Sequence, residues 1–148
     1  MPTPTFMSIA LEEARAAGAR GEVPVGCVVV SDGTIVARAG NRTIADHDPT
    51  AHAELIAIRA AASTLGSERL TDCDLYVTLE PCAMCAAAMS FARIRRLYFG
   101  AADAKGGAVE HGVRFFAAPT CHHRPEVYGG INESECGELL KNFFQARR

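Results

Sequence analysis

The residues best suited to chemistry in this chain are His52, Cys82 and Cys85, which can act together as ligands of one metal ion. Cys82 and Cys85 are three positions apart in a predicted helix, so both sulfur atoms lie on one face of it. That helix follows a strand directly, and the free N–H groups and positive end of its first turn favour thiolates. His52 stands in the first turn of another predicted helix, after a loop that can carry its imidazole over the sulfurs.

Glu54 indicates what such a metal site would do. One imidazole and two thiolates favour zinc over ions that prefer oxygen ligands. Three ligands leave the fourth tetrahedral position to water, as in catalytic rather than structural zinc sites. Zinc lowers the pKa of a bound water to about 7, and a carboxylate beside it can accept and pass on a proton. Glu54, two residues after His52, therefore predicts zinc-dependent hydrolysis.

The order of these residues is more informative than either half of the pattern. A Cys-x-x-Cys pair alone also fits half of a structural zinc site or a redox pair, and His-x-Glu alone is weaker still. Together they form His-Ala-Glu, a helix, a strand and then Pro-Cys-x-x-Cys. The remaining histidines have no partners at ligand spacing, so we expect them on the surface or in loops: His47, His111, His122 and His123.

Alternating helices and strands must position the four residues. Hydrophobic periodicity, together with Gly and Pro at the boundaries, predicts helices over about 5–19, 50–65, 82–91 and 133–146. The same patterns predict strands over 25–30, 35–39, 75–79, 97–100 and, more briefly, 127–128. Strands that alternate with helices imply one mixed sheet covered on both faces. The length of 148 residues fits a single domain over 1–148.

Two of the predicted helices carry specific packing expectations. In the second helix we expect Ala53, Ile56, Ala57 and Ala60 to face the core. In the closing helix the apolar stripe is Leu139, Leu140, Phe143 and Phe144. We expect Phe143 in the core and leave Phe144 open between packing and base stacking.

Composition narrows the classes of protein. The net charge is −2, so any RNA-binding surface must be local, and each small basic cluster alone is more readily explained as a solvated face. No apolar run reaches the roughly 18 residues that could span a bilayer. The first twenty residues lack a basic segment followed by an apolar one, and they include Glu12 and Glu13. We therefore expect a cytoplasmic protein without a membrane partner, whose six cysteines bind metal or stay free.

The chain resembles the cytidine deaminase-like superfamily, whose signature is His-x-Glu followed by Pro-Cys-x-x-Cys. Within it the chain is most similar to the bacterial tRNA-specific adenosine deaminases. The resemblance extends over nearly the whole chain and is carried by residues 22–26, 40–42, 47–54, 75–82, 93–94, 100–101, 103–105 and 142–144. The zinc motif is common to the superfamily, whereas Val-Pro-Val-Gly, Asp-Ala-Lys and the terminal Phe-Phe favour the tRNA branch. Residues 106–120 depart from the family's commonest pattern and receive no role from it.

The resemblance implies a three-layer α-β-α fold with a five-stranded mixed sheet, and a homodimer with active sites near the subunit interface. It implies one Zn²⁺ per subunit, no organic cofactor, and a tRNA anticodon stem-loop as substrate, with wobble adenosine converted to inosine. His52, Cys82 and Cys85 would be the ligands and Glu54 the catalytic proton shuttle. Substrate binding would fall to residues around the pocket: Asn41 at the flipped nucleoside, Asp103 at the adjoining sugar-phosphate strand, and Phe144 with Arg147 and Arg148 along the anticodon loop.

Other interpretations of these residues stay open. Asn41 follows a strand and a glycine and could be only a turn residue, and Asp103 could cap the turn before Lys105. A deaminase of a free base or nucleoside, such as guanine or cytosine, would share every zinc residue, and the net acidity mildly favours that alternative. A non-catalytic RNA-binding subunit with a structural zinc would not need Glu54.

Overall fold

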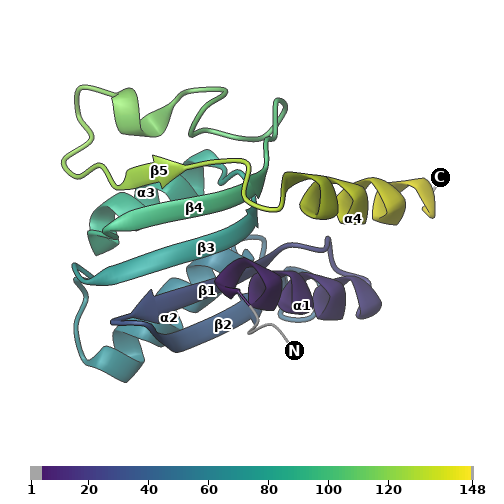
Figure 1. Cartoon of the computed structure of the whole chain (residues 1–148), viewed down its shortest axis with the longest axis horizontal. Coiled ribbons are helices and arrows are strands. Elements are labelled where there is room, and N and C mark those ends of the chain that lie inside the picture. Colours follow the sequence, from purple (N-terminus) through teal and green to yellow (C-terminus); the bar gives the residue numbers. More distant parts are fainter. Residues whose placement is uncertain (1–4, 148) are drawn as a thin grey trace.

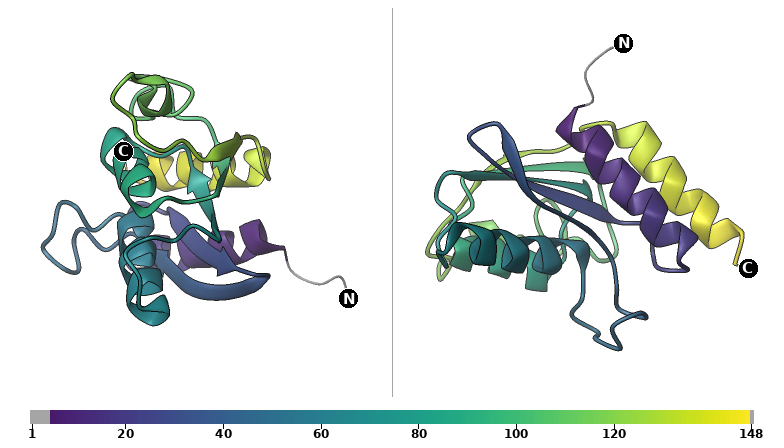
Figure 2. Two further views of the ribbon diagram at one scale, coloured as in Figure 1. Left: turned by 90° about the vertical axis from the view of Figure 1, so that its left-hand side faces the viewer. Right: turned by 90° about the horizontal axis from the view of Figure 1, so that it is seen from below.

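The computed structural model, which describes residues 5–147, has a mixed five-stranded sheet between two layers of helices (Figures 1 and 2). The elements along the chain are α1 (Phe6–Ala19), β1 (Gly26–Ser31), β2 (Thr34–Gly40), α2 (Ala53–Leu65), β3 (Cys73–Leu79), α3 (Ala83–Ala92), β4 (Arg96–Ala101), the short 3-10 helix η1 (Phe115–Ala117), β5 (Glu126–Tyr128) and α4 (Glu133–Gln145). The strand order is β2-β1-β3-β4-β5. Strand β1 runs antiparallel to β2 and β3, whereas β3, β4 and β5 are parallel. The predicted three-layer α-β-α fold is confirmed.

The hairpin of β1 and β2 starts the sheet. Its two turn residues are Asp32 and Gly33, with φ values of 51° and 74°, so both occupy the left-handed region. An Asp-Gly pair in that region matches the right-handed twist of the flanking strands, which is why it is favoured in two-residue hairpins. Ser31 pairs with Thr34 on either side of this turn.

Helices α2 and α3 cover one face of the sheet (Figure 2). In α2 the buried alanines are Ala53, Ala57 and Ala61, one turn apart, and their small side chains leave room for close packing. The prediction that Ala60 faces the core was wrong, because Ala60 is exposed and Ala61 takes the buried position. Apolar residues lie on several sides of α2, so periodicity alone did not define which side is buried.

Helices α1 and α4 lie side by side on the opposite face (Figure 2). Helix α1 approaches β1 so closely at Gly26 that a Cβ there would be 2.0 Å from the carbonyl oxygen of Ala10. Helix α4 buries little besides Cys136, and its C-terminal half projects from the sheet (Figure 1). The prediction that Phe143 belongs to the core was wrong. Its ring is half-buried and lies 3.5 Å from the guanidinium carbon of Arg147, a cation–π contact at the surface.

The basic residues and cysteines follow the sequence-based expectations in the described part of the chain. Arg95 pairs with Asp74 at 3.0 Å, and Arg96 pairs with Glu126 at 2.8 Å, so these charges are locally neutralised. All six cysteines are free thiols. Among residues 5–147, no helix is both long enough and apolar enough to cross a bilayer. Arg148 lies outside the described residues.

Candidate metal and catalytic site

The three predicted metal ligands meet in one cluster. The Nδ1 atom of His52 lies 3.6 Å from the sulfur of Cys82 and 3.6 Å from the sulfur of Cys85. Tetrahedral zinc bonds of ordinary length hold a nitrogen and a sulfur ligand about 3.6 Å apart. All three ligand atoms lie within 4.8 Å of one another. The donor set and its spacing therefore fit a zinc ion without rearrangement of these side chains.

Two helix N-termini bring the ligands together. His52 is the N-cap residue of α2 and Cys82 is the N-cap residue of α3, each with extended backbone. Neither side chain caps its own helix, so both are available as ligands. We had placed His52 and Cys82 inside the first helical turns, but each stands one position earlier. The N–H groups and positive ends of both helices still stabilise negative charge at the cluster.

The surroundings of the two sulfurs shift their pKa values in opposite directions. The pKa of Cys82 is lowered to about 4, chiefly by a hydrogen bond from the Cys85 thiol and also by His52. The pKa of Cys85 is raised, because its thiol donates to Cys82 and is buried. Hydrogen bonding to Cys82 raises the pKa of His52. A zinc ion bound here takes the place of these shared protons.

Glu54 lies in the first turn of α2, two residues from His52, and is only 4% exposed. Burial raises the pKa of its carboxyl group to about 7, and the negative charge of Cys82 acts in the same direction. The hydrogen bond from its own backbone N–H partly opposes the rise. A carboxyl group that titrates near neutral pH can both accept and donate a proton during one reaction cycle.

A pocket of about 330 Å³ opens over the cluster, a volume suited to a small ligand such as a nucleobase. Its lining includes His52, Glu54 and Cys82, with Asn41 and Asp103 on its walls. The structure therefore brings five of the predicted site residues to one cavity. Of the other two, Cys85 completes the ligand cluster but is fully buried, and Phe144 lies outside this cavity.

Asn41 has both a structural contact and a place in the pocket wall. Its side-chain oxygen accepts a hydrogen bond of 2.8 Å from the N–H group of Ala53, the first residue of α2. This contact supplies the cap that the His52 side chain does not provide. The amide nitrogen of Asn41 has no hydrogen-bond partner within residues 5–147. It can therefore donate to a molecule in the pocket.

Asp103 also has two roles in the structure. One carboxylate oxygen accepts hydrogen bonds from the N–H groups of Lys105 and Gly106, at 3.1 and 2.9 Å. This is the turn-capping arrangement that we left open as an alternative to substrate binding. Asp103 nevertheless lines the pocket, so the turn presents a carboxylate to whatever binds there.

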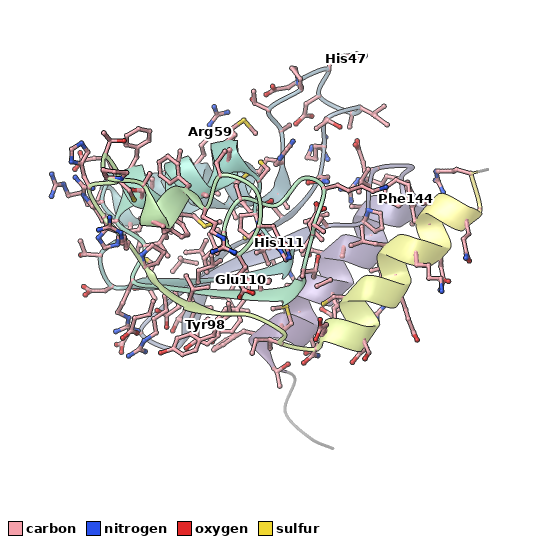
Figure 3. All side chains as sticks on the ribbon, turned by 90° about the horizontal axis from the view of Figure 1, so that it is seen from above. His47, Arg59, Tyr98, Glu110, His111 and Phe144 are labelled. Atoms are coloured by element: carbon pink, nitrogen blue, oxygen red, sulfur yellow. The ribbon has the colours of Figure 1, made fainter. Side chains whose placement is uncertain are left out.

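Phe144 does not reach the metal pocket. It projects from α4 with 49% of its surface exposed (Figure 3). It lines an adjoining hollow of about 480 Å³, which shares Asp103 and Gly106 with the metal pocket. Asp103 thus stands between the two cavities, and a ligand larger than one nucleoside could extend from one to the other.

Two buried carboxylates near the pocket were missed at the sequence level. Glu22 is 1% exposed and accepts hydrogen bonds from the backbone N–H groups of Ile44 and Ala45, at 3.1 and 2.9 Å. Glu80 is 2% exposed and accepts from several N–H groups after β4. Although burial acts to raise the pKa of each, hydrogen bonds from backbone N–H groups hold it below the ordinary glutamate value. A glutamate next to an apolar segment was the available signal in both cases.

Comparison with known proteins places this site in a family. A family model described as the cytidine and deoxycytidylate deaminase zinc-binding region matches residues 2–101. The chain is 64% identical over 143 residues to the tRNA-specific adenosine deaminase of Agrobacterium fabrum, covering 97% of this chain and 94% of that protein. It is 45% identical to the Rickettsia bellii protein of the same name, covering 96% and 99% of the two chains.

Solved structures give the same result. One, from a study of A-to-I editing by tRNA:A34 deaminases at the wobble position of transfer RNA, matches with a TM-score of 0.90 and 66% identity, covering 91% of this chain and 98% of that one. A guanine deaminase from Bacillus subtilis matches less closely, with a TM-score of 0.65 and 33% identity over 99% and 94% of the chains. The chain therefore belongs to the zinc-dependent cytidine and deoxycytidylate deaminase family, within the branch of the tRNA-specific adenosine deaminases.

Proposed function

We propose that this protein hydrolytically deaminates adenosine to inosine at the wobble position of a tRNA anticodon. The observation that carries the proposal is the 64% identity, over 97% of the chain, to a tRNA-specific adenosine deaminase. The zinc-ligand cluster and the buried Glu54 beside one pocket supply the chemistry that such a reaction needs. We assign the activity to a single domain spanning residues 1–148.

His52, Cys82 and Cys85 would hold one zinc ion per subunit. When bound, zinc lowers the pKa of a water molecule to about 7 and so makes a nucleophile available at neutral pH. Glu54 would accept a proton from the attacking water and deliver it to N1 of the adenine ring. A C6–O bond would form, Glu54 would next take the remaining proton from the new C6 hydroxyl and pass it to the amine, and the C6–N bond would break to release ammonia and leave the C6 carbonyl of inosine.

The pocket walls would hold the nucleoside and the strand on either side of it. The free amide nitrogen of Asn41 donates a hydrogen bond to the nucleoside. The second carboxylate oxygen of Asp103 accepts one from a ribose 2′-OH, the group that distinguishes RNA from DNA. Phe144 offers an exposed ring on which a neighbouring base can stack.

The partners follow from the substrate. The anticodon stem-loop presents an adenine that is already unpaired, which lowers the cost of extruding it into the pocket. We further propose a homodimer in the cytoplasm, where tRNA is available. Phe91 on α3 supports a subunit contact, because 73% of this large apolar side chain is exposed in the single chain.

A substrate panel tests the proposal directly. The zinc-containing protein is incubated with an anticodon stem-loop that carries adenosine at the wobble position, and separately with free adenosine, adenine, guanine and cytidine. Ammonia release and inosine formation are measured. We expect inosine from the stem-loop alone. Turnover of a free base or nucleoside, with no reaction of the stem-loop, would contradict the proposal.

Deamination of guanine is the second candidate, because a guanine deaminase is 33% identical and shares the fold. The tRNA enzymes are favoured because their identity reaches 64%. The same panel separates the two functions through the guanine reaction.

A further inference from the structure

We propose that Glu80 is a positioning residue whose buried carboxylate clamps residues 103–111 onto the turn before Cys82 and thereby sets one wall of the substrate pocket. The inference rests on the proposed function only for its kinetic consequence. The clamp itself is a property of the folded chain. It also gives a role to residues 106–111, the first part of the segment 106–120 to which the sequence assigned none.

Both carboxylate oxygens of Glu80 are occupied by this segment. The Oε1 atom accepts a hydrogen bond of 2.9 Å from the backbone N–H of Asp103 and lies 2.8 Å from Nδ1 of His111. The Oε2 atom accepts from three consecutive backbone N–H groups, those of Val109, Glu110 and His111, at 3.1, 2.8 and 3.0 Å. Successive N–H groups that converge in this way form a concave anion-binding site. Here the anion is a side chain of the same protein.

The clamp replaces secondary structure that the segment lacks. Residues 102–114 contain no helix or strand, so no regular ladder satisfies their backbone donors. The Glu80 side chain is fully buried, whereas that of His111 is 38% exposed, so the segment closes over the carboxylate. Hydrogen bonds to an ionised acceptor are stronger than neutral ones. Their loss would leave several partly buried N–H groups without an acceptor.

Gly107 supplies independent evidence that the segment is shaped around this carboxylate. A Cβ at Gly107 would lie 2.5 Å from the carboxyl carbon of Glu80 and 2.5 Å from the carbonyl oxygen of Asp103. Only glycine therefore fits between them. The next residue, Ala108, donates a backbone hydrogen bond of 2.8 Å to the carbonyl oxygen of Pro81. The segment is thus fastened to both residues that precede the metal ligand Cys82.

The clamp acts on the pocket through Asp103 and Gly106. Both residues line the metal pocket and also the adjoining hollow beside Phe144. Because Glu80 directly precedes Pro81 and Cys82, it links the position of this wall to the position of a metal ligand. Glu80 also lines the metal pocket, but both of its carboxylate oxygens are engaged by residues 103–111, so it acts there by holding the wall. Glu54, on α2, makes no hydrogen bond to Glu80 or to residues 103–111 in the part of the chain that the structure describes, and would keep its own geometry.

The kinetic test compares Glu80→Gln with Gly107→Ala, using Glu110→Gln as a matched control. The control removes one carboxylate charge from the clamped segment but leaves the backbone N–H of residue 110 in the clamp. We expect KM for the anticodon stem-loop to rise about tenfold in Glu80→Gln and Gly107→Ala, with kcat changed less than about threefold. Zinc content stays equal to that of the wild type. Loss of zinc, or a fall in kcat at unchanged KM, would overturn the positioning role.

A second measurement does not depend on substrate. Hydrogen–deuterium exchange is followed by mass spectrometry for peptides covering residues 103–111. In the wild type and in Glu110→Gln these amides should exchange slowly despite the absence of regular structure, and in Glu80→Gln and Gly107→Ala they should exchange at least about tenfold faster. If Glu80→Gln fails to fold, the exchange rates of residues 103–111 in Gly107→Ala and in the wild type still test the clamp.

Exchange in the wild type as fast as in the exposed turn at 32–33 would overturn the clamp. Slow exchange in a protein that does not act on tRNA would instead support the clamp and contradict the proposed function. The two inferences can therefore fail separately.

Discussion

The floor of the pocket and its rim are built in different ways. The floor consists of His52, Glu54, Cys82 and Cys85, which sit at the N-termini of two packed helices. The rim consists of Asn41 and Asp103 in loops, and Phe144 lies beyond it in the adjoining hollow, on the exposed side of α4. The comparison indicates that the chemistry depends on regular elements, whereas recognition depends on segments that other side chains must hold in place.

Each of the two rim loops is held by a buried carboxylate that accepts hydrogen bonds from backbone N–H groups, and the floor has no such arrangement among the described residues. Glu22 holds the loop after Asn41 through backbone N–H groups of Ile44 and Ala45, and Glu80 holds the loop that contains Asp103. Each carboxylate is buried and each contact joins distant parts of the chain. If the division holds, floor variants should lower kcat and rim variants should mainly raise KM or alter selectivity.

Removal of the metal should have the largest effect. A chelator that strips zinc from the His52–Cys82–Cys85 cluster should abolish deamination, and added Zn²⁺ should restore it. The far-ultraviolet circular dichroism should change little, because most of both hydrophobic clusters comes from other residues. Activity is compared with zinc content measured by atomic spectroscopy. Full activity in a preparation without zinc would show that deamination does not require the metal.

Replacement of Glu54 by Gln should have the next largest effect. The amide keeps the shape but cannot carry a proton, so kcat should fall about 10³-fold while zinc content and KM change little. Single-turnover inosine formation and metal analysis provide the two readouts. A Gln variant with full zinc and near-normal turnover would show that another group moves the protons.

Asn41→Asp separates the two contacts of the first rim residue. An aspartate can still accept from the Ala53 N–H, so the start of α2 should be retained. It cannot donate to the nucleoside, and kcat/KM should fall about 30-fold, most of it through KM. The thermal midpoint is measured alongside the kinetics. A fall in stability with unchanged kcat/KM would show that Asn41 only caps α2 and does not bind the nucleoside.

Asp103→Asn should change selectivity more than rate. The amide oxygen can keep the turn bonds from Lys105 and Gly106, but the second atom becomes a donor. We expect the preference for RNA over DNA stem-loops to fall about tenfold. The matched measurement is kcat/KM on ribo- and deoxyribo- versions of one stem-loop. An unchanged ratio of the two kcat/KM values would show that Asp103 only caps its turn.

Phe144→Ala should have the smallest effect, a rise in KM of about fivefold, because its exposed ring can stack on one base at most. Phe143→Ala is the neighbouring control, since that ring lies under Arg147. Binding of the stem-loop is followed by fluorescence anisotropy. Equal effects of the two substitutions would point to packing of α4 rather than base stacking.

The difference between the floor and the rim of the pocket also explains how much could be predicted from the sequence. The cluster of His52, Cys82 and Cys85 could be predicted because each ligand is placed by short-range spacing at the start of a helix. The sheet, its hairpin and the helix–strand order were also predictable from local periodicity. The roles of Glu22 and Glu80 were not, because most of their partners are backbone N–H groups 22 to 31 residues away, which almost any residue type provides.

The sequence also did not determine which side of a helix is buried. Along α2, Ala60 and Ala61 are the same residue type, and only the sheet beneath decides which one is buried. Phe143 has the spacing of a core residue, but α4 contacts the sheet mainly near Cys136, so the ring stays at the surface. In both cases tertiary contacts decide the outcome.

The most direct test of the account is the position at which inosine forms. The zinc-containing protein is given two anticodon stem-loops of equal length, one with adenosine at the wobble position and one with the adenosine moved to the next nucleotide, and products are mapped by sequencing. We predict inosine at the wobble position of the first and none in the second. Equal editing of both, or deamination of free guanine with no editing of either, would contradict the assignment of the pocket and its rim to wobble adenosine.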